Sequence, residues 1–368
     1  MKILHVLDSV NRGGAETLVL DVCRNAAAFD MEVMVAAGDG PLLTEFANSG
    51  RPLFHLKRRL PFDPLHAAEL RRIIRSNAID VIHTHQAVDA LHSLAAAAGL
   101  KVPVVLSHHG IVPDAKNRIT TRFVLPRVAH NIVVAGTILR QYDELYGIRF
   151  GANTSVLYNG VDTSRLSPEG GDPRAELGIA HDTPLIGMIG NFYPERRKDQ
   201  MTVCRALPQV LEQLPDVKCL FIGGVEPGAE AKFEKCRRFC DDNGLGASVY
   251  FLGRRSDVPD LLSALDIFVF SSFQEGLPIA LNEAMLAGVP TVVSDIPPLI
   301  EASASGTYSL VFPVGDAAAL AERVVGLLND PAMRSDLAEK AHQFAAANFT
   351  IEAHLTKLGE LYRSLRDI

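Results

Sequence analysis

Segments of strand character and segments of helix character alternate along the whole chain, and this alternation constrains the fold more than any other feature. The run "KILHVLD" at residues 2–8 has the character of a buried strand. The segment "GGAETLVLDVCRNAAAF" from Gly13 has the spacing of an amphipathic helix, and "MEVMVAA" at 31–37 returns to strand character. Strands that alternate with helices predict a parallel sheet with helices on both faces.

The same pattern runs through both halves of the chain. Further strands are expected at 80–85, 103–109, 131–136, 154–160, 184–191, 217–224, 248–253, 266–272 and 290–296. Between the halves, "NGVDTSRLSPEGGDPRAELG" at 159–178 is rich in Gly, Pro, Ser and Asp, which indicates an interdomain connection. The stretch from 330 to 365 is helical in pattern throughout.

The predicted fold is therefore α/β, with two Rossmann-like, doubly wound parallel-sheet domains at residues 1–165 and 166–348. A chain of 368 residues has a suitable length for two such domains. In open parallel sheets, ligands bind outside the carboxyl ends of the strands. We therefore expect the functional residues in the turns that lead from strands into helices.

Charge and composition exclude several classes of protein. The formal net charge of −7 argues against general nucleic-acid binding. The five cysteines lack metal-site spacing, and an odd number of them suits a reducing compartment. The start "MKILHVLDSV" does not have the form of a signal peptide, and no apolar run reaches the about 18 residues that a membrane span needs. We expect a cytoplasmic protein.

The first half is the more basic one. Residues 1–165 carry 18 Lys and Arg against 15 Asp and Glu, and cations gather in "HLKRRLP" at 55–61 and "LHAAELRRIIRS" at 65–76. The second segment has helical periodicity with a basic face. Such a face suits peripheral contact with anionic lipid on the inner side of a membrane, or an anionic acceptor. A solvated surface helix is the alternative.

The segment "EGLPIALNEAMLAG" at 275–288 carries the most specific chemistry. A strand precedes it, Pro278 suits the first helical position, and Gly288 suits the helix end. The N-terminus of such a helix attracts phosphate. Glu275 and Glu283 offer acceptors for hydroxyl groups on either side, so the pattern fits a sugar nucleotide. Alternatively, Glu283 is a solvated helix residue and Glu275 a loop charge.

These segments resemble the retaining family-4 glycosyltransferases of GT-B fold (glycosyl transferases group 1). The resemblance rests on the E-x7-E motif of Glu275 and Glu283, on "YNGVD" at 158–162, on "FLGRRSDVPDLLSALDIFV" at 251–269 and on an N-terminal glycine pair. It covers essentially the whole chain. It implies two domains facing a cleft, a final helix at 349–368 that crosses back to the N-terminal domain, and transfer from a nucleoside-diphosphate sugar.

The resemblance also implies roles in donor binding. Glu275 would contact the donor sugar and Glu283 the ribose. The backbone after the first glutamate, at Gly276, Leu277 and Pro278, would hold the diphosphate, although Pro278 has no N–H to donate. Arg254 stands where the family seats the nucleobase; neither the base nor the sugar can be read from the sequence.

The loop "GNFYPERRKDQ" at 190–200 would supply cations for the diphosphate. The family usually has an arginine directly after the glycine, but this chain has Asn191 there. Lys198 is the match for the family's lysine. Either Arg196 or Arg197 would replace the missing arginine, and at least one of these three cations belongs to an ordinary solvated turn.

The N-terminal half supplies the remaining candidates. The turn with Gly13 and Gly14 lacks the GxGxxG pattern, so a dinucleotide cofactor is not indicated. In the family this turn closes over the donor phosphates. His109 matches the family's histidine near the donor sugar and the reacting centre. His108 and His85 are placed on the acceptor side, His108 as a packing or orienting residue.

The predicted activity is metal-independent, retaining transfer of a sugar to a glycan, a lipid-linked molecule or a small molecule, without a cofactor. No DxD pair follows a strand to hold a divalent ion. Cations and the helix tip would offset the charge that develops on the diphosphate. The alternatives are a non-catalytic protein that binds sugar nucleotides, and a sugar-nucleotide epimerase or hydrolase of the same fold.

Overall fold

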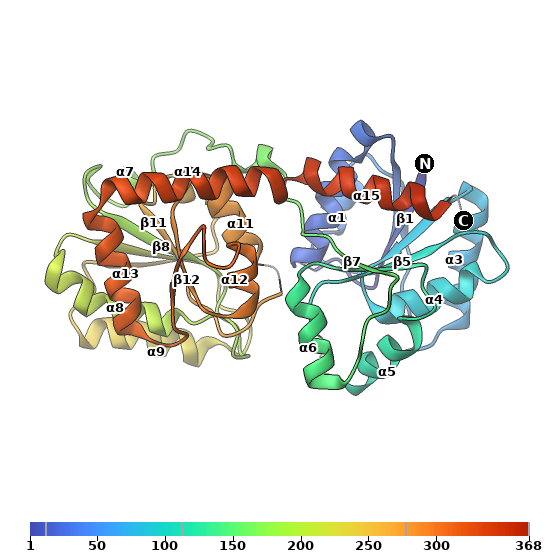
Figure 1. Cartoon of the computed structure of the whole chain (residues 1–368), viewed down its shortest axis with the longest axis horizontal. Coiled ribbons are helices and arrows are strands. Elements are labelled where there is room, and N and C mark those ends of the chain that lie inside the picture. Colours follow the sequence, from blue (N-terminus) through green and yellow to red (C-terminus); the bar gives the residue numbers. More distant parts are fainter. Residues whose placement is uncertain (12, 112–113, 277, 367–368) are drawn as a thin grey trace. The chain divides into compact units, whose positions relative to one another are not determined.

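The computed structural model describes residues 1–11, 13–111, 114–276 and 278–366, and the chain forms two compact units (Figure 1). Unit 1 consists of Met1–Asp162 and Asn348–Ile368, and unit 2 of Thr163–Ala347. Each unit contains one sheet of parallel strands with helices packed against it. The prediction of two parallel-sheet α/β domains is thereby confirmed.

Unit 1 is built on a seven-stranded parallel sheet in the order β3-β2-β1-β4-β5-β6-β7. Its strands are β1 (Lys2–Leu7), β2 (Glu32–Ala37), β3 (Leu53–His55), β4 (Val81–Thr84), β5 (Val104–His108), β6 (His130–Val133) and β7 (Thr154–Val156). Its helices are α1 (Gly14–Asn25), η1 (Ala26–Phe29), α2 (Leu43–Ala47), α3 (Pro64–Asn77), α4 (Ala87–Ala97), α5 (Ala115–Val124), α6 (Gly136–Tyr146) and α15 (Ile351–Arg366).

Both faces of this sheet are covered. Ile3 and Leu7 of β1 belong to the apolar core formed with α1 and α15, whereas Leu4 and Val6 belong to the core formed with α3 and α4. Successive side chains of a strand point to opposite faces, and a sheet buried on both faces needs apolar residues on each. This explains why the strands of unit 1 show runs of apolar residues.

Helix α15 is an integral part of unit 1. The Val161 N–H donates to the Phe349 carbonyl (2.8 Å), and the Ile351 N–H donates to the Val161 carbonyl (2.9 Å). Gly160 permits this approach, because a Cβ at that position would lie 2.8 Å from the Cβ of His354. The buried residues that α15 adds to the core are Ile351, Leu355, Leu358 and Tyr362.

Unit 2 is built on a six-stranded parallel sheet in the order β10-β9-β8-β11-β12-β13. Its strands are β8 (Leu185–Ile189), β9 (Lys218–Ile222), β10 (Val249–Gly253), β11 (Ile267–Phe270), β12 (Thr291–Ser294) and β13 (Leu310–Phe312). Its helices are η2 (Thr163–Leu166), α7 (Pro173–Glu176), α8 (Gln200–Gln213), α9 (Glu230–Asp242), α10 (Val258–Ser263), α11 (Ile279–Leu286), α12 (Pro297–Ala302), α13 (Ala317–Asn329) and α14 (Pro331–Asn348).

The structure differs from the sequence-based expectations at a few elements. The edge strands β3 and β13 were not predicted, because each has three residues and is too short a run to show a pattern. The equally short β7 was predicted because it lies in the longer run of strand character at 154–160. The helical stretch at 330–365 is interrupted at Phe349 and Thr350. The helix expected to begin at Pro278 begins at Ile279, with Pro278 in an extended conformation as its N-cap.

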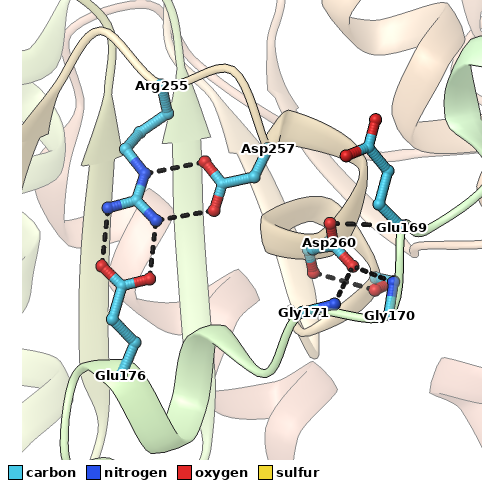
Figure 2. Close-up of polar contacts among 8 residues, drawn as sticks. Glu169, Gly170, Gly171, Glu176, Arg255, Asp257 and Asp260 are labelled. Atoms are coloured by element: carbon cyan, nitrogen blue, oxygen red, sulfur yellow. Dashed lines mark hydrogen bonds and ion pairs between the residues drawn. The ribbon is translucent and has the colours of Figure 1, made fainter.

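The segment that follows the unit boundary is tied to unit 2 through two carboxylate contacts (Figure 2). The buried carboxylate of Asp260 accepts hydrogen bonds from the N–H groups of Glu169 (3.3 Å), Gly170 (3.1 Å) and Gly171 (3.0 Å). Close by, the Arg255 guanidinium donates two hydrogen bonds to the Glu176 carboxylate, both at 2.7 Å. The buried contact is the stronger anchor, because water cannot reach this position to accept the three N–H hydrogen bonds in place of the carboxylate.

We predict that Asp260→Asn lowers the free energy of unfolding of unit 2 by about 2 kcal/mol, because the amide nitrogen cannot accept an N–H hydrogen bond. Glu176→Gln makes the same chemical change at a half-exposed ion pair and should cost less than about 1 kcal/mol. Urea unfolding curves of both variants would measure the difference. Equal losses in the two variants would contradict the anchoring role of Asp260.

Candidate active site

In unit 2, the structure brings Lys198 and Glu275 together as an ion pair. Strands β8 and β11 are neighbours, and the loop after each strand carries one partner. The Nζ of Lys198 lies 2.6 Å from Oε1 of Glu275, and the two side chains are only 12% and 8% exposed. The loops also share backbone contacts, since the Asp199 N–H donates to the Ser271 carbonyl (3.0 Å). A buried pair therefore stands at the carboxyl edge of this sheet.

The surroundings of Lys198 favour an ammonium that is poorly hydrated. Burial lowers the pKa of Lys198, and the Glu275 carboxylate opposes that shift. The Nζ also lies 3.8 Å from the centre of the Phe270 ring, a favourable cation–π position. A cation held in this way has few waters to lose when an anion binds beside it.

Ser272 is a site residue that the sequence analysis missed. Its hydroxyl oxygen lies within hydrogen-bond distance of Glu275 Oε1 and 3.0 Å from the Arg197 carbonyl oxygen. The Ser272 N–H donates to the Ser294 hydroxyl (3.0 Å), which fixes the backbone at the end of β11. The available signal was a serine three residues before the first glutamate of the motif.

The two arginines of the β8 loop lie on aromatic rings. The Arg196 guanidinium carbon lies 4.0 Å from the centre of the Phe273 ring, and that of Arg197 lies 4.6 Å from the Tyr193 ring. The geometry does not distinguish which arginine replaces the family's missing one. Arg196, Lys198 and Phe273 all line a hollow of about 410 Å³, whereas Arg197 does not line it.

Asn191, where the family has an arginine, belongs to a polar network with Glu226 and Arg254. Its Oδ1 accepts the Gly224 N–H (2.8 Å), and its Nδ2 donates to Glu226 Oε1 (2.7 Å). Arg254 Nη2 donates to the same carboxylate oxygen (2.6 Å). Gly224 lets Arg254 pass closely, because a Cβ there would lie 2.5 Å from Arg254 Nε. Glu226 is thus a second residue that the sequence analysis missed.

Helix α11 carries the rest of the motif. Gly276 and Pro278 precede it, and Glu283 lies half-buried on its second turn. Leu277, one of the predicted phosphate ligands, lies outside the described residues. The roles of these residues toward a donor remain predictions.

In unit 1, the structure brings His85 and His109 together. Nδ1 of His85 lies 2.9 Å from Nε2 of His109, and their rings stack with centroids 5.2 Å apart. Both line a hollow of about 340 Å³ that α5 and Tyr142 also border. Its lining combines the rings of these two histidines with the polar side chains of Asn117 and Thr121, which suits a ligand with hydroxyl groups.

The surroundings of His108 and of the glycine pair indicate mainly structural roles. The His108 Nε2 lies 3.1 Å from the Asn131 Oδ1, and its ring packs edge-on against Tyr142 and Phe150. Its ring also reaches the wall of the same hollow. Gly13 is the N-cap of α1 and Gly14 its first residue, so the pair lies at the start of the helix that follows β1.

Among the described residues, one group of three side chains could hold a metal ion, namely His5, His83 and His85, whose ligand atoms lie within 4.8 Å of one another. The His83 nitrogens, however, lie 2.5 Å from the Tyr362 hydroxyl and 2.7 Å from the Ser107 hydroxyl. Both nitrogens of His85 have histidine partners. A metal would have to break these hydrogen bonds, so the donor set fits an uncharged hydrogen-bonded cluster better.

Buried histidines make unit 1 sensitive to acid. Burial lowers the pKa of His5 and His109 to about 3 and of His108 and His354 to about 4. The unfolded chain protonates these groups near pH 6.5, so this stability is present above pH 6.5 and is lost as pH falls. The loss between pH 6.5 and 5.0 is about 1.6 kcal/mol for each. Burial raises the pKa of Asp89 to about 7, which opposes the loss by about 2 kcal/mol.

We therefore predict that these groups together cost unit 1 about 4 kcal/mol of stability between pH 6.5 and 5.0, and that the lowered pKa values of His83 and His85 add to this loss. Unit 2 is the internal control, because its two histidines are His181, which is exposed, and His342. Pulse proteolysis in urea with peptide mapping would follow both units in one sample. Equal loss of protection in the two units would show that the buried histidines are not the cause.

Comparisons with known proteins match glycosyltransferases along both halves of the chain. A family model described as Glycosyltransferase Family 4 matches residues 12–165, and one described as Glycosyl transferases group 1 matches residues 183–330. The Escherichia coli UDP-Gal:alpha-D-GlcNAc-diphosphoundecaprenol alpha-1,3-galactosyltransferase is 27% identical over 285 residues, which cover 73% of this chain and 72% of that protein. The Mycobacterium leprae phosphatidyl-myo-inositol mannosyltransferase is 27% identical over 336 residues, covering 88% and 85%.

A solved structure shows the same fold. The crystal structure of Anabaena HepE in complex with UDP matches with a TM-score of 0.86 and 22% identity, over 99% of this chain and 100% of that chain. The same protein in complex with UDP-glucose matches with a TM-score of 0.81. The chain belongs to the family-4 glycosyltransferases of glycosyl transferases group 1, and its fold is that of the GT-B glycosyltransferases.

Proposed function

We propose that this glycosyltransferase moves a sugar from a nucleoside-diphosphate sugar to its acceptor with retention of configuration and without a divalent metal or a cofactor. The observation that carries the proposal is the buried ion pair of Lys198 and Glu275 at the carboxyl edge of the unit 2 sheet. A buried pair contributes little net stability, because desolvation offsets the attraction between the charges. Such a pair at a sheet edge is therefore better explained by ligand binding.

In this proposal the two partners have different tasks. Lys198, with Arg196 or Arg197 and the N-terminus of α11, offsets the charge that develops on the leaving diphosphate. Glu275, held by Lys198 and Ser272, orients the sugar while its anomeric carbon becomes oxocarbenium-like. The acceptor hydroxyl then attacks from the face that the diphosphate leaves. Glu275 is a positioning group here, and no covalent intermediate on it is required.

The donor is proposed to be a UDP- or GDP-sugar. The Anabaena neighbour was crystallised with UDP and with UDP-glucose, and the E. coli relative is named for UDP-Gal. A relative from Corynebacterium glutamicum is named as GDP-mannose-dependent. For the base we propose Arg254, and for the ribose Glu283.

The acceptor is proposed to be a glycan, a lipid-linked molecule or a small molecule, bound in the hollow of unit 1 that His85 and His109 line. A non-catalytic sugar-nucleotide-binding protein and an epimerase or hydrolase are less well supported. The curated relatives reported above are named as transferases, which favours transfer over both alternatives.

The first test is donor binding and turnover in the presence of EDTA. We predict that one UDP- or GDP-sugar raises the melting temperature of unit 2 and is consumed without added metal. Glu275→Gln and Lys198→Met should each lower turnover at least about a hundredfold, which corresponds to about 2.7 kcal/mol of transition-state stabilisation. Glu234→Gln is the matched control, because it changes a carboxylate in an exposed ion pair on α9, outside the candidate site.

The outcomes separate the alternatives. Binding without consumption by any acceptor tested would favour a non-catalytic protein. Consumption that stops with EDTA and returns with Mg²⁺ would overturn metal independence. A product with inverted anomeric configuration would overturn retention.

We also propose peripheral contact between unit 1 and an anionic membrane. No helix in the described part of the chain has the length and apolar character that crossing a bilayer needs. Leu60, Phe62 and Leu65 are 60%, 54% and 74% exposed, and Lys57 and Arg59 are exposed beside them. Exposed apolar side chains among cations suit the interface of an anionic bilayer.

Vesicle sedimentation tests this contact. The triple variant Leu60→Ser, Phe62→Ser, Leu65→Ser should lose most binding to vesicles that contain phosphatidylglycerol, whereas phosphatidylcholine vesicles bind neither protein. Ile119→Ser with Phe123→Ser removes exposed apolar side chains from α5 and is the matched control. Equal binding by the triple variant would show that these three side chains do not make the contact with the membrane.

A further inference from the structure

Two buried histidine rings of unit 1, His5 and His85, and the partly buried ring of His109 form a hydrogen-bonded chain that ends at the candidate site. Nδ1 of His5 lies 3.0 Å from Nε2 of His85, and Nδ1 of His85 lies 2.9 Å from Nε2 of His109. The rings are stacked, with centroids 5.3 Å and 5.2 Å apart. The two outer nitrogens, His5 Nε2 and His109 Nδ1, are buried and have no hydrogen-bond partner in the part of the chain that the structure describes.

The sheet itself places these rings in a row. Strands β1, β4 and β5 are adjacent, and His5 is the register partner of His83. Because side chains alternate between faces, His83 and His85 point to the same face as each other, and the row continues past the end of β5 to His109. The chain is therefore a product of strand order and register.

The hydrogen bonds couple the protons of the three rings. Each contact between two imidazole nitrogens needs one N–H and one bare nitrogen, and a neutral imidazole has one of each. With all rings neutral, only two arrangements satisfy both contacts. In one, every Nδ1 carries the proton. In the other, every Nε2 carries it, so that His109 Nδ1 and His5 Nε2 always have opposite states.

The protein holds these rings neutral. Burial lowers the pKa of His5 and His109 to about 3, and burial together with its histidine neighbours lowers the pKa of His85 well below its usual value. A change at His109 therefore cannot be accommodated by an imidazolium, because the charged form is disfavoured along the whole chain. Only the tautomer of each ring, that is, which of its two nitrogens carries the proton, can still change.

The far end of the chain favours one arrangement, although no hydrogen bond joins His5 Nε2 to a described residue. His5 and Asn159 line a cavity of about 10 Å³ together with His354. Asn159 Oδ1 is a buried acceptor without a hydrogen-bond partner among the described residues. An acceptor in this cavity favours an N–H on His5 Nε2. Through the two contacts, that arrangement puts the proton of His109 on Nε2 and leaves its Nδ1 bare.

We propose that His5 and His85 are positioning residues that hold His109 in the Nε2–H tautomer, so that His109 Nδ1 accepts a hydrogen bond from a hydroxyl group of the bound sugar or acceptor. The inference deepens the proposed function and rests on it for the identity of the ligand. The tautomer itself does not depend on any ligand. His5 acts through His85 and has no contact with the hollow that His109 lines.

The test is the tautomer of His109 in the full chain labelled with ring-¹⁵N histidine, measured without substrate by long-range ¹H–¹⁵N spectra. His109→Gln identifies its signals. We expect a protonated Nε2 and a bare Nδ1 in the wild type. In His5→Phe, which keeps a ring in the stack, the His109 signals should shift toward a mixture of tautomers, although residue 5 makes no hydrogen bond to residue 109.

Two further variants keep the test decisive. His85→Asn supplies a carboxamide oxygen that can accept from His109 Nε2–H, and it should preserve the wild-type signature of His109 while breaking the link to His5. Tyr362→Phe is the matched control, because it removes a buried hydrogen bond to His83 outside the chain and should leave His109 unchanged. Melting curves establish that each variant is folded.

Several results would overturn the proposal. These are a proton on His109 Nδ1 in the wild type, an unchanged His109 signature in His5→Phe, or a shift in Tyr362→Phe as large as in His5→Phe. A stoichiometric metal ion that is lost in His5→Phe would also overturn it, since a ligated nitrogen carries no proton.

Activity gives a separate readout once a donor is known. His5→Phe should lower kcat several-fold and leave the KM for the donor nearly unchanged, and His85→Asn should lower kcat less than His5→Phe does. If no donor is turned over, the proposed function fails while the spectra still decide the tautomer. If the donor is turned over but His5→Phe has full activity, the positioning role fails alone.

Discussion

Coverage of both faces of each parallel sheet is the constraint on which the rest of this structure depends. It leaves the carboxyl edges of the strands as the places where polar side chains can meet a ligand. It also means that any polar group within the sheet must find its partner inside the protein, because water cannot reach it. The apolar cores on both faces of the unit 1 sheet show that each face is covered.

The two units satisfy that constraint in different ways. Unit 2 holds opposite charges at its edge, with Lys198 and Glu275 paired and Phe270 beneath the ammonium. Unit 1 holds uncharged imidazoles that bond to one another and to hydroxyl groups, as at His83. The first arrangement suits the binding of an anionic diphosphate, and the second suits hydroxyl groups whose hydrogen bonds need a defined donor or acceptor.

Contacts outside the two candidate sites anchor helices and connecting segments in each unit. Helix α15 closes one face of unit 1 and supplies the Tyr362 hydroxyl to the histidine cluster, and Gly160 permits its approach. Asp260 fixes the segment after the unit boundary onto unit 2 through three N–H groups.

The sequence by itself determined the fold class, the two sheets and the family. Strand and helix periods are local properties, and the E-x7-E segment with its flanks is contiguous. Short edge strands such as β3 escaped prediction because three residues show no period. Only the tertiary structure decided which side chains meet: His5 and His85 are 80 positions apart, and Ser272 and Lys198 belong to different loops. Alternation along a strand decides the face on which a side chain lies, whereas the order and register of the strands decide its neighbours, and these depend on the packing of the whole unit.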